Sequence, residues 1–261
     1  VSKYDTAVHY IQKASDIDLA IKHKASHIVL LNSLLYEKLC HSFSSMPRVT
    51  HVTLEKLELK RLSGLWPIKL EYLNCQSNNL RSLHGLDFPS TLKELNCSSN
   101  ELRIDSEFLW PPNLKELNCN HNRLTRLPPL PHTLLHLNCL DNKLETLPSL
   151  PPSLKTLVCD TNDLTRLPAL PRTLLHLVCK DNGLDRLPTL SPSLEILDCS
   201  LNNLEELPTL PPKLIVLRCN DNQLTKLPKL PSALKILFCS SNEFTSLPPM
   251  PSGLVQRECE L

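Results

Sequence analysis

Apolar and polar positions follow a pattern of 20 residues that recurs along most of the chain. The repeat reads L-x-x-L-x-C-x-x-N-x-L-x-x-L-P-x-L-P-x-x. Its seven regular copies begin at Leu114, Leu134, Leu154, Leu174, Leu194, Leu214 and Leu234. Two 22-residue versions begin at Leu70 and Leu92, an incomplete one begins at Leu254, and weaker forms continue upstream to Ala25. About twelve repeats over residues 25–261 predict a solenoid, in which each repeat buries its apolar face only against its neighbours.

Each part of the repeat predicts a local structure. The L-x-x-L-x-C stretch has the alternation of a half-buried strand, so Leu117 and Cys119 should point inward while Glu116 and Asn118 point outward. The Asn after each strand is expected to be buried, because its amide can satisfy backbone groups where the chain turns inward. The L-P-x-L-P stretch lacks backbone donors at its prolines, which predicts an extended, polyproline-like return. The expected fold therefore has a parallel β-sheet on a concave face and an extended convex back.

Residues 1–24 lack the repeat and are predicted to form a helical N-terminal cap, which would cover the apolar face of the first repeat. The stripe at helical spacing comprises Tyr4, Val8, Ile11 and Ala14. Ser15 followed by Asp18 resembles the signal of a helix N-terminus. The incomplete repeat at the other end carries Arg257 where a leucine is expected. It is predicted to be a partial C-terminal cap of the repeat region 25–261.

Composition and charge narrow the classes of partner. The chain has 28 Lys and Arg against 27 Asp and Glu, which argues against a nucleic-acid partner, since such proteins carry a basic excess. It contains no run of apolar residues long enough to span a bilayer, so no membrane partner is expected. The 23 prolines come with a 41% hydrophobic content, which is too high for a disordered proline-rich segment.

Ten of the 11 cysteines occupy the same inward position of the repeat. They are Cys75, Cys97, Cys119, Cys139, Cys159, Cys179, Cys199, Cys219, Cys239 and Cys259. The spacing predicts a buried column of structural thiols, because neighbours in a parallel sheet point the same way and are poorly placed for disulfides. No C-x-x-C pair is present for zinc, and neither a metal nor a cofactor is expected. A column of free thiols is typical of a protein that works in the reducing environment of the cytosol. Cys40 lies outside the column and is predicted to be a packing residue.

The short repeats with L-P-x-L-P backs resemble the leucine-rich repeats of secreted bacterial effectors, a group that includes YopM, the IpaH-type ligases and Legionella leucine-rich repeat effectors. The resemblance is strong over residues 70–254 and weak over 25–69. The chain departs from the group at the repeated cysteine, where Val or Ile is more usual. The resemblance implies a leucine-rich repeat solenoid preceded by helices. It also implies secretion into the host cytoplasm and non-enzymatic binding of a host protein or another bacterial effector, which would be inhibited or scaffolded.

Two other functions remain open. In the IpaH-type ligases a separate C-terminal domain carries ubiquitin-ligase chemistry, so this chain could be the substrate-recognition half of such a ligase without its catalytic domain. The C-x-D pattern of that nucleophile occurs here at Cys139–Asp141, Cys179–Asp181 and Cys219–Asp221. All three cysteines belong to the buried column, whereas a catalytic thiol must be accessible, so no enzyme is predicted. The other alternative is self-association through the C-terminal edge, although we expect a monomer.

The outward strand positions change character along the chain. Up to about residue 130 they are polar; afterwards apolar residues replace them. These are Leu135, Leu140, Val158, Leu175, Val178, Ile196, Ile215, Val216, Ile236 and Phe238. Their phase predicts an apolar strip on the concave face, and the charged residues around it are Asp160, Lys180, Asp181, Asp198, Arg218 and Asp221. An apolar strip with a polar rim is typical of a protein-binding site, although strand propensity alone also favours Val and Ile.

Two further sets of residues are candidate sites. His136 and His176 share one outward strand position two repeats apart, which is roughly 10 Å and too far to share a metal ion. They are predicted to be surface residues of the same concave face. A basic column on the descending turns contains Arg126, Arg166, Arg186 and Lys226. Acidic neighbours dilute it, so it is predicted to be a solvated edge rather than a site for an acidic partner.

Overall fold

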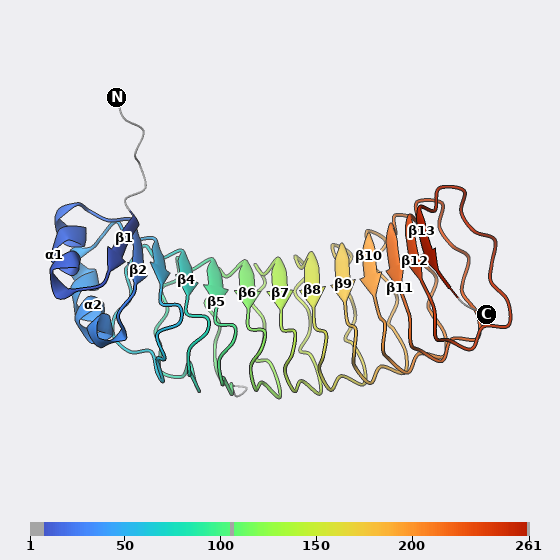
Figure 1. Cartoon of the computed structure of the whole chain (residues 1–261), viewed down its shortest axis with the longest axis horizontal. Coiled ribbons are helices and arrows are strands. Elements are labelled where there is room, and N and C mark those ends of the chain that lie inside the picture. Colours follow the sequence, from blue (N-terminus) through green and yellow to red (C-terminus); the bar gives the residue numbers. More distant parts are fainter. Residues whose placement is uncertain (1–7, 105–106, 260–261) are drawn as a thin grey trace, which may run out of the picture. The chain divides into compact units, whose positions relative to one another are not determined.

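The computed structural model describes residues 8–104 and 107–259, and the chain divides into two compact units. Unit 1 ends at Arg123 and unit 2 begins at Leu124. In each unit, short parallel strands lie side by side and extended segments return on the opposite side (Figure 1). The predicted leucine-rich repeat solenoid is confirmed.

The described residues of unit 1, 8–104 and 107–123, form six strands, two α-helices and two 3-10 turns. In chain order these are β1 (Val8–Ile11), α1 (Ala14–Lys22), β2 (His27–Leu30), η1 (Ser33–Leu35), α2 (Tyr36–Ser42), η2 (Phe43–Ser45), β3 (His51–Thr53), β4 (Tyr72–Asn74), β5 (Glu94–Asn96) and β6 (Glu116–Asn118). Strands β1 to β6 are parallel and follow their order in the chain. Leu73, Leu95 and Leu117 therefore lie in register as inward residues.

The N-terminal region is only partly helical. The predicted helix is present as α1, but residues Val8–Ile11 form β1 and pair with β2, so the predicted helical stripe is wrong there; Tyr4 lies outside the described residues. The helix begins after Lys13 rather than at Ser15. The Asp16 carboxylate accepts the free backbone N–H groups of Gln12 and Lys13 at 3.0 and 2.9 Å. These hydrogen bonds, with Lys13 first, lower the pKa of Asp16. The domain boundary after residue 24 remains a prediction.

Unit 2 consists of regular repeats, and residues 124–259 contain no helix. Its strands are β7 (His136–Asn138), β8 (Thr156–Val158), β9 (His176–Val178), β10 (Ile196–Asp198), β11 (Val216–Arg218), β12 (Ile236–Phe238) and β13 (Gln256–Glu258). All are parallel, and each residue of β7 to β12 pairs with the residue 20 positions later. In the last strand Arg257 pairs with Leu237 and is exposed, where other repeats place a buried leucine.

A ladder of asparagines joins successive repeats, as predicted. Asn202 donates to the carbonyl groups of Cys199 and Ser200 in its own repeat and of Cys179 in the preceding one, at 3.0 to 3.1 Å. Its Oδ1 accepts the backbone N–H of Leu184 at 3.1 Å. One amide thus satisfies four backbone groups where the chain leaves the strand, and six such asparagines are buried. Asn162, Asn182 and Asn242 make the same contacts while half-buried.

The cysteine column is buried, but the expectation that all its thiols are free is wrong at its end. The eight column cysteines from Cys75 to Cys219 form no disulfide and are fully buried. Several donate to a carbonyl of the next repeat, such as Cys75 to Asn96 at 3.4 Å between Sγ and O. Cys239 and Cys259 form a disulfide with a Cα–Cα distance of 4.7 Å. This spacing of neighbouring strands lies within the range that a disulfide bridges, so in-register parallel positions do allow one.

The return segments are extended, as the prolines predict, and no residue of them in unit 2 is helical. The turn before each ladder asparagine needs a left-handed residue, and a positive φ recurs there from Ser77 to Ser241. Leu201 takes this conformation at φ 54° although it is an apolar L-residue. Within the described part of the chain, no helix has the length and hydropathy needed to cross a membrane.

Candidate functional site

The outward side chains of β7 to β12 form two parallel rows on the sheet face of unit 2. Row A takes the first residue of each strand: His136, Thr156, His176, Ile196, Val216 and Ile236. Row B takes the third: Asn138, Val158, Val178, Asp198, Arg218 and Phe238. All twelve side chains are half-buried, because strand neighbours about 4.8 Å apart cover one another's flanks and leave the tips exposed.

The predicted apolar residues lie on adjacent strands and occupy both rows rather than one. Val158 and Val178 are neighbours in row B. Ile196, Val216 and Ile236 are neighbours in row A. On β8 and β9 the apolar residues therefore lie in row B, and from β10 onward row A is apolar. In row B, Val178 of β9 pairs with the charged Asp198 of β10.

Arg218 and Phe238 form the most specific contact of the two rows. They pair in register, and the Arg218 guanidinium carbon lies 5.6 Å from the centre of the Phe238 ring. A guanidinium at this distance is attracted to the negative face of the ring. The contact holds both long side chains in place on the sheet face, which lowers the entropy that binding would cost.

Asp160 and Lys180 follow β8 and β9 at the edge of row B. The Asp160 carboxylate accepts the backbone N–H of Lys180 at 3.1 Å. Burial raises the pKa of Asp160 to about 6; the hydrogen bond from Lys180 opposes this rise and the charge of Asp198 adds to it. The face therefore carries a carboxylate whose charge changes near neutral pH.

His136 and His176 lie on the same face and are separated by one strand, as predicted. Thr156 pairs with both of them, and His136 Nδ1 lies 3.1 Å from Thr156 Oγ1. Sequence reasoning missed Thr156 as a member of this row, although its position in the repeat is the same. The described residues 8–104 and 107–259 contain no cluster of three or more His, Cys, Asp or Glu side chains that could hold a metal ion.

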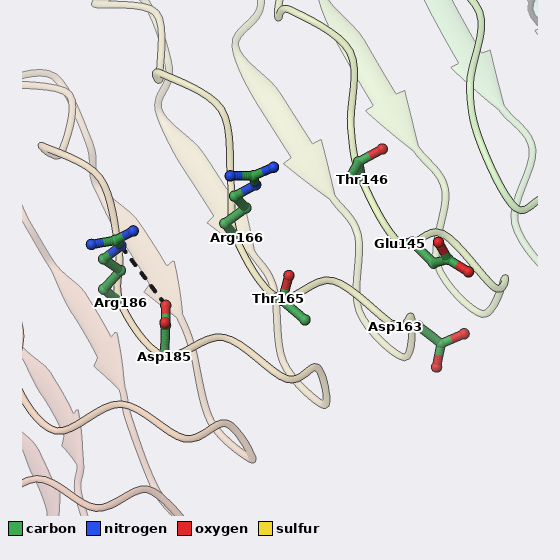
Figure 2. A pocket seen from close by; sticks show the side chains of 7 residues that line it. All are labelled: Glu145, Thr146, Asp163, Thr165, Arg166, Asp185 and Arg186. Atoms are coloured by element: carbon green, nitrogen blue, oxygen red, sulfur yellow. Dashed lines mark ion pairs between the residues drawn. The ribbon is translucent and has the colours of Figure 1, made fainter.

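The predicted basic column borders a shallow hollow on the flank of unit 2. Figure 2 shows Arg166 and Arg186 on successive repeats, with Thr146 on the repeat before them. Three carboxylates, those of Glu145, Asp163 and Asp185, line the same hollow. Asp185 Oδ1 lies 3.9 Å from Arg186 Nε. The mixed charges fit the predicted solvated edge better than a site for an anion.

Sequence reasoning also missed an aromatic row on the sheet face of unit 1. His27, His51 and Tyr72 occupy its row A and stack with ring centres 4.0 and 5.4 Å apart. Ser26 and Thr50 contact the Nδ1 atoms of the two imidazoles at 3.0 and 2.9 Å. Burial, and then the neighbouring His27, lower the pKa of His51. The alternation of the first repeats could have shown that these three side chains face outward together.

Comparisons with known proteins agree with the repeats and the fold. The family described as Leucine Rich Repeat matches residues 113–134. No curated protein sequence matches the chain. The structure of YopM from Yersinia enterocolitica WA-314 is similar with a TM-score of 0.72 and 30% identity, over 89% of this chain and 53% of that one. YopM from Yersinia pestis, described as a leucine-rich effector protein, gives a TM-score of 0.75 and 32% identity, over 82% and 61%.

A third similar structure comes from another bacterial protein. The functional domain of InlJ from Listeria monocytogenes, described as including a cysteine ladder, has a TM-score of 0.60 and 29% identity, over 75% of this chain and 46% of that one. The chain thus spans about half to three fifths of the length of these proteins. Its repeat sequence, its fold and these likenesses agree: the chain is a leucine-rich repeat protein whose repeats are similar to those of the bacterial effector YopM.

Proposed function

We propose that the protein binds another protein through the sheet face of unit 2 and thereby inhibits or scaffolds it. The observation that carries this proposal is the pair of apolar patches, Val158 with Val178 and Ile196 with Val216 and Ile236, whose outward side chains the repeat does not require. Half-buried apolar side chains beside charged ones are typical of the core and rim of protein interfaces. Strand propensity alone would not place them in unit 2 and leave the corresponding strands β5 and β6 polar.

The residues proposed to contact the partner form one surface. They are His136, Val158, Asp160, His176, Val178, Lys180, Ile196, Asp198, Val216, Arg218, Ile236 and Phe238. Arg218 and Phe238 should contribute most, because arginine and aromatic side chains dominate binding energy at interfaces and these two already support each other. Binding by this surface needs no catalytic group, since covering the active site of an enzyme is enough to inhibit it.

The likeness to YopM supports a role as a secreted effector. The proposed setting is the cytoplasm of a host cell, and the proposed partner is a host protein or a bacterial effector enzyme. We expect the protein to be monomeric until it meets this partner.

The test begins with affinity capture from host and bacterial lysates, followed by affinity measurements on the protein retained. The Arg218→Ala/Phe238→Ala double variant should bind the identified partner at least about 30-fold more weakly than wild type, the loss expected of an interface hot spot. Arg186→Ala on the flank is the matched control, because it removes an exposed arginine outside the sheet face.

Circular dichroism and urea unfolding should show that the double variant keeps the wild-type fold. The proposal fails if the partner binds the folded double variant as tightly as wild type, or if Arg186→Ala weakens binding to the same extent.

A further inference from the structure

The β13 segment, defined as residues 251–259, contributes little to the apolar core of unit 2. None of these residues is buried, whereas Leu234 and Leu237 of the preceding repeat are completely buried. Arg257 takes the inward position that pairs with Leu237, and Leu254 is only half-buried. Repeats hold together mainly because each one covers the apolar side chains of its neighbour. Packing therefore gives the β13 segment less stability than it gives to the preceding repeat.

Backbone hydrogen bonds and one disulfide join the β13 segment to the repeat of β12, and Figure 1 shows the two strands side by side. The N–H of Val255 donates to the carbonyl of Lys235 at 2.8 Å. The N–H of Cys239 donates to the carbonyl of Glu258 at 2.7 Å. The disulfide joins Cys239 to Cys259 over a sequence separation of 20 residues. Such a covalent link stabilises the paired state, because it restricts the chain when the two strands separate.

This disulfide is the group of the cysteine column on which a reductant can act. The nine other cysteines form no disulfide. Cys239 is completely buried and Cys259 is half-buried, so an external thiol has to approach from the Cys259 side. The next thiol of the column is that of Cys219, and burial raises its pKa to about 12. A protonated thiol does not attack a disulfide, so the bond stays with this pair and does not pass along the column.

We propose that the Cys239–Cys259 disulfide is a redox switch: its reduction by a thiol such as glutathione separates the β13 segment from β12. A first glutathione thiolate attacks the Sγ of Cys259, forms a mixed disulfide there and releases the thiolate of Cys239. A second attacks the glutathione sulfur of the mixed disulfide, releases the thiolate of Cys259 and leaves as oxidised glutathione. Two electrons thus pass to the protein, and the two cysteine thiolates take up the protons that the two glutathione thiols lost.

Separation of the β13 segment changes the end of the sheet face. Gln256 pairs with Ile236, and Glu258 pairs with Phe238, so release of the segment exposes one flank of both apolar side chains. Oxidising surroundings keep the segment attached, and the reducing cytosol releases it. The effect on a partner rests on the function proposed for this face, whereas the release of the segment does not depend on it.

The experiment measures hydrogen exchange by mass spectrometry on the full chain without a partner. The protein is oxidised with glutathione disulfide, and half of it is then treated with millimolar reduced glutathione. Alkylation after denaturation should count nine thiols before this treatment and 11 after it. Reduction should speed the exchange of residues 251–259 at least about 10-fold, because a disulfide that closes a loop of this length contributes substantial stability. The corresponding segment 191–199 of β10 should exchange at an unchanged rate.

Matched variants separate the disulfide from the rest of the segment. Cys259→Ser should exchange in the oxidised preparation as fast as the reduced wild-type protein. Ser252→Ala is the control, because it changes an exposed residue of the same segment and keeps both cysteines. Arg257→Leu places an apolar side chain where it can pack on Leu237, so its reduced form should exchange at least about 3-fold more slowly than reduced wild type.

Three outcomes would overturn the proposal. The first is a thiol count that shows no disulfide in the oxidised protein, or no reduction of it by glutathione in the folded protein. The second is unchanged exchange of residues 251–259 after the thiol count has shown reduction. The third is an equal acceleration in residues 191–199, which would show general loosening of unit 2. Each of these outcomes leaves the proposed partner surface untested and intact, since no partner is present.

Discussion

Asp160 illustrates how a single side chain of the proposed interface acts on the fold. Its carboxylate is held between strands by the backbone N–H of Lys180, and burial raises its pKa to about 6. A carboxyl whose pKa is higher in the folded than in the unfolded state binds protons more tightly when folded. Its ionisation therefore lowers stability as pH rises from the ordinary value of 3.8 through about 6.

We expect Asp160→Asn to stabilise the protein at neutral pH, because the amide oxygen can still accept the N–H of Lys180 and no charge is buried. The advantage over wild type should shrink as pH falls through about 6 and vanish below 3.8, where the carboxyl is neutral in both states. Urea unfolding of both proteins across this range measures it. Asp163→Asn, at an exposed position, controls for the change in net charge. An advantage that does not vary with pH would contradict the prediction.

At the scale of the elements, each three-residue strand is too short to be stable alone. Its ends are held by the asparagine ladder, which ties the exit of one strand to the repeat before it. Because a ladder amide satisfies four backbone groups, its loss leaves several buried groups unpaired at once. The ladder rather than strand pairing alone should therefore determine how firmly neighbouring repeats hold together.

Asn202→Ala should lower the free energy of unfolding by about 2–4 kcal/mol, since it removes all four side-chain hydrogen bonds in a buried position. Asn203→Ala is the matched control, because the next residue is also an asparagine but is exposed. Chemical denaturation measures both. Equal losses for the two variants would show that the ladder contacts contribute little.

At the scale of the whole molecule, the free thiols are shielded throughout both units. The nine free cysteines are buried, and burial raises the pKa of Cys97, Cys139 and Cys219 to about 12. A thiol that is both inaccessible and protonated does not react with alkylating agents. Alkylation of the column cysteines should therefore occur only when the protein unfolds. The cysteines of the three C-x-D matches belong to this column.

Alkylation followed by mass spectrometry measures how many thiols react in the native protein, in the denatured protein and in the denatured, reduced protein. The native protein should take up no label, the denatured protein nine labels and the denatured, reduced protein all 11, because Cys239 and Cys259 are joined. Labelling of all 11 cysteines after denaturation without a reductant would show that the disulfide is absent. Rapid labelling of the native protein would contradict the burial of the column.

Much of the fold was predictable because the repeat imposes the same constraint many times. The alternation of leucines gave the strands, the prolines excluded helical returns, and the asparagines could be placed at the turns before their contacts were known. Near the N-terminus the repeat is weak, and there the prediction of a helical stripe failed at Val8–Ile11. Isolated spacing cannot distinguish a helix from a strand that pairs with β2, because pairing depends on a partner distant in sequence.

The sequence by itself determined which strand residues of unit 2 face inward and which outward, since a period of 20 residues fixes the register of its strands. Tertiary structure alone decided which outward side chains touch: the Arg218 guanidinium carbon lies 5.6 Å from the centre of the Phe238 ring, and His136 Nδ1 lies 3.1 Å from Thr156 Oγ1. It also decided that Cys239 and Cys259 are close enough to join and that Trp110 buries a donor without an acceptor. The reason is physical. Periodicity sets direction along one strand, whereas contacts across strands depend on side-chain size, burial and the spacing of neighbouring chains.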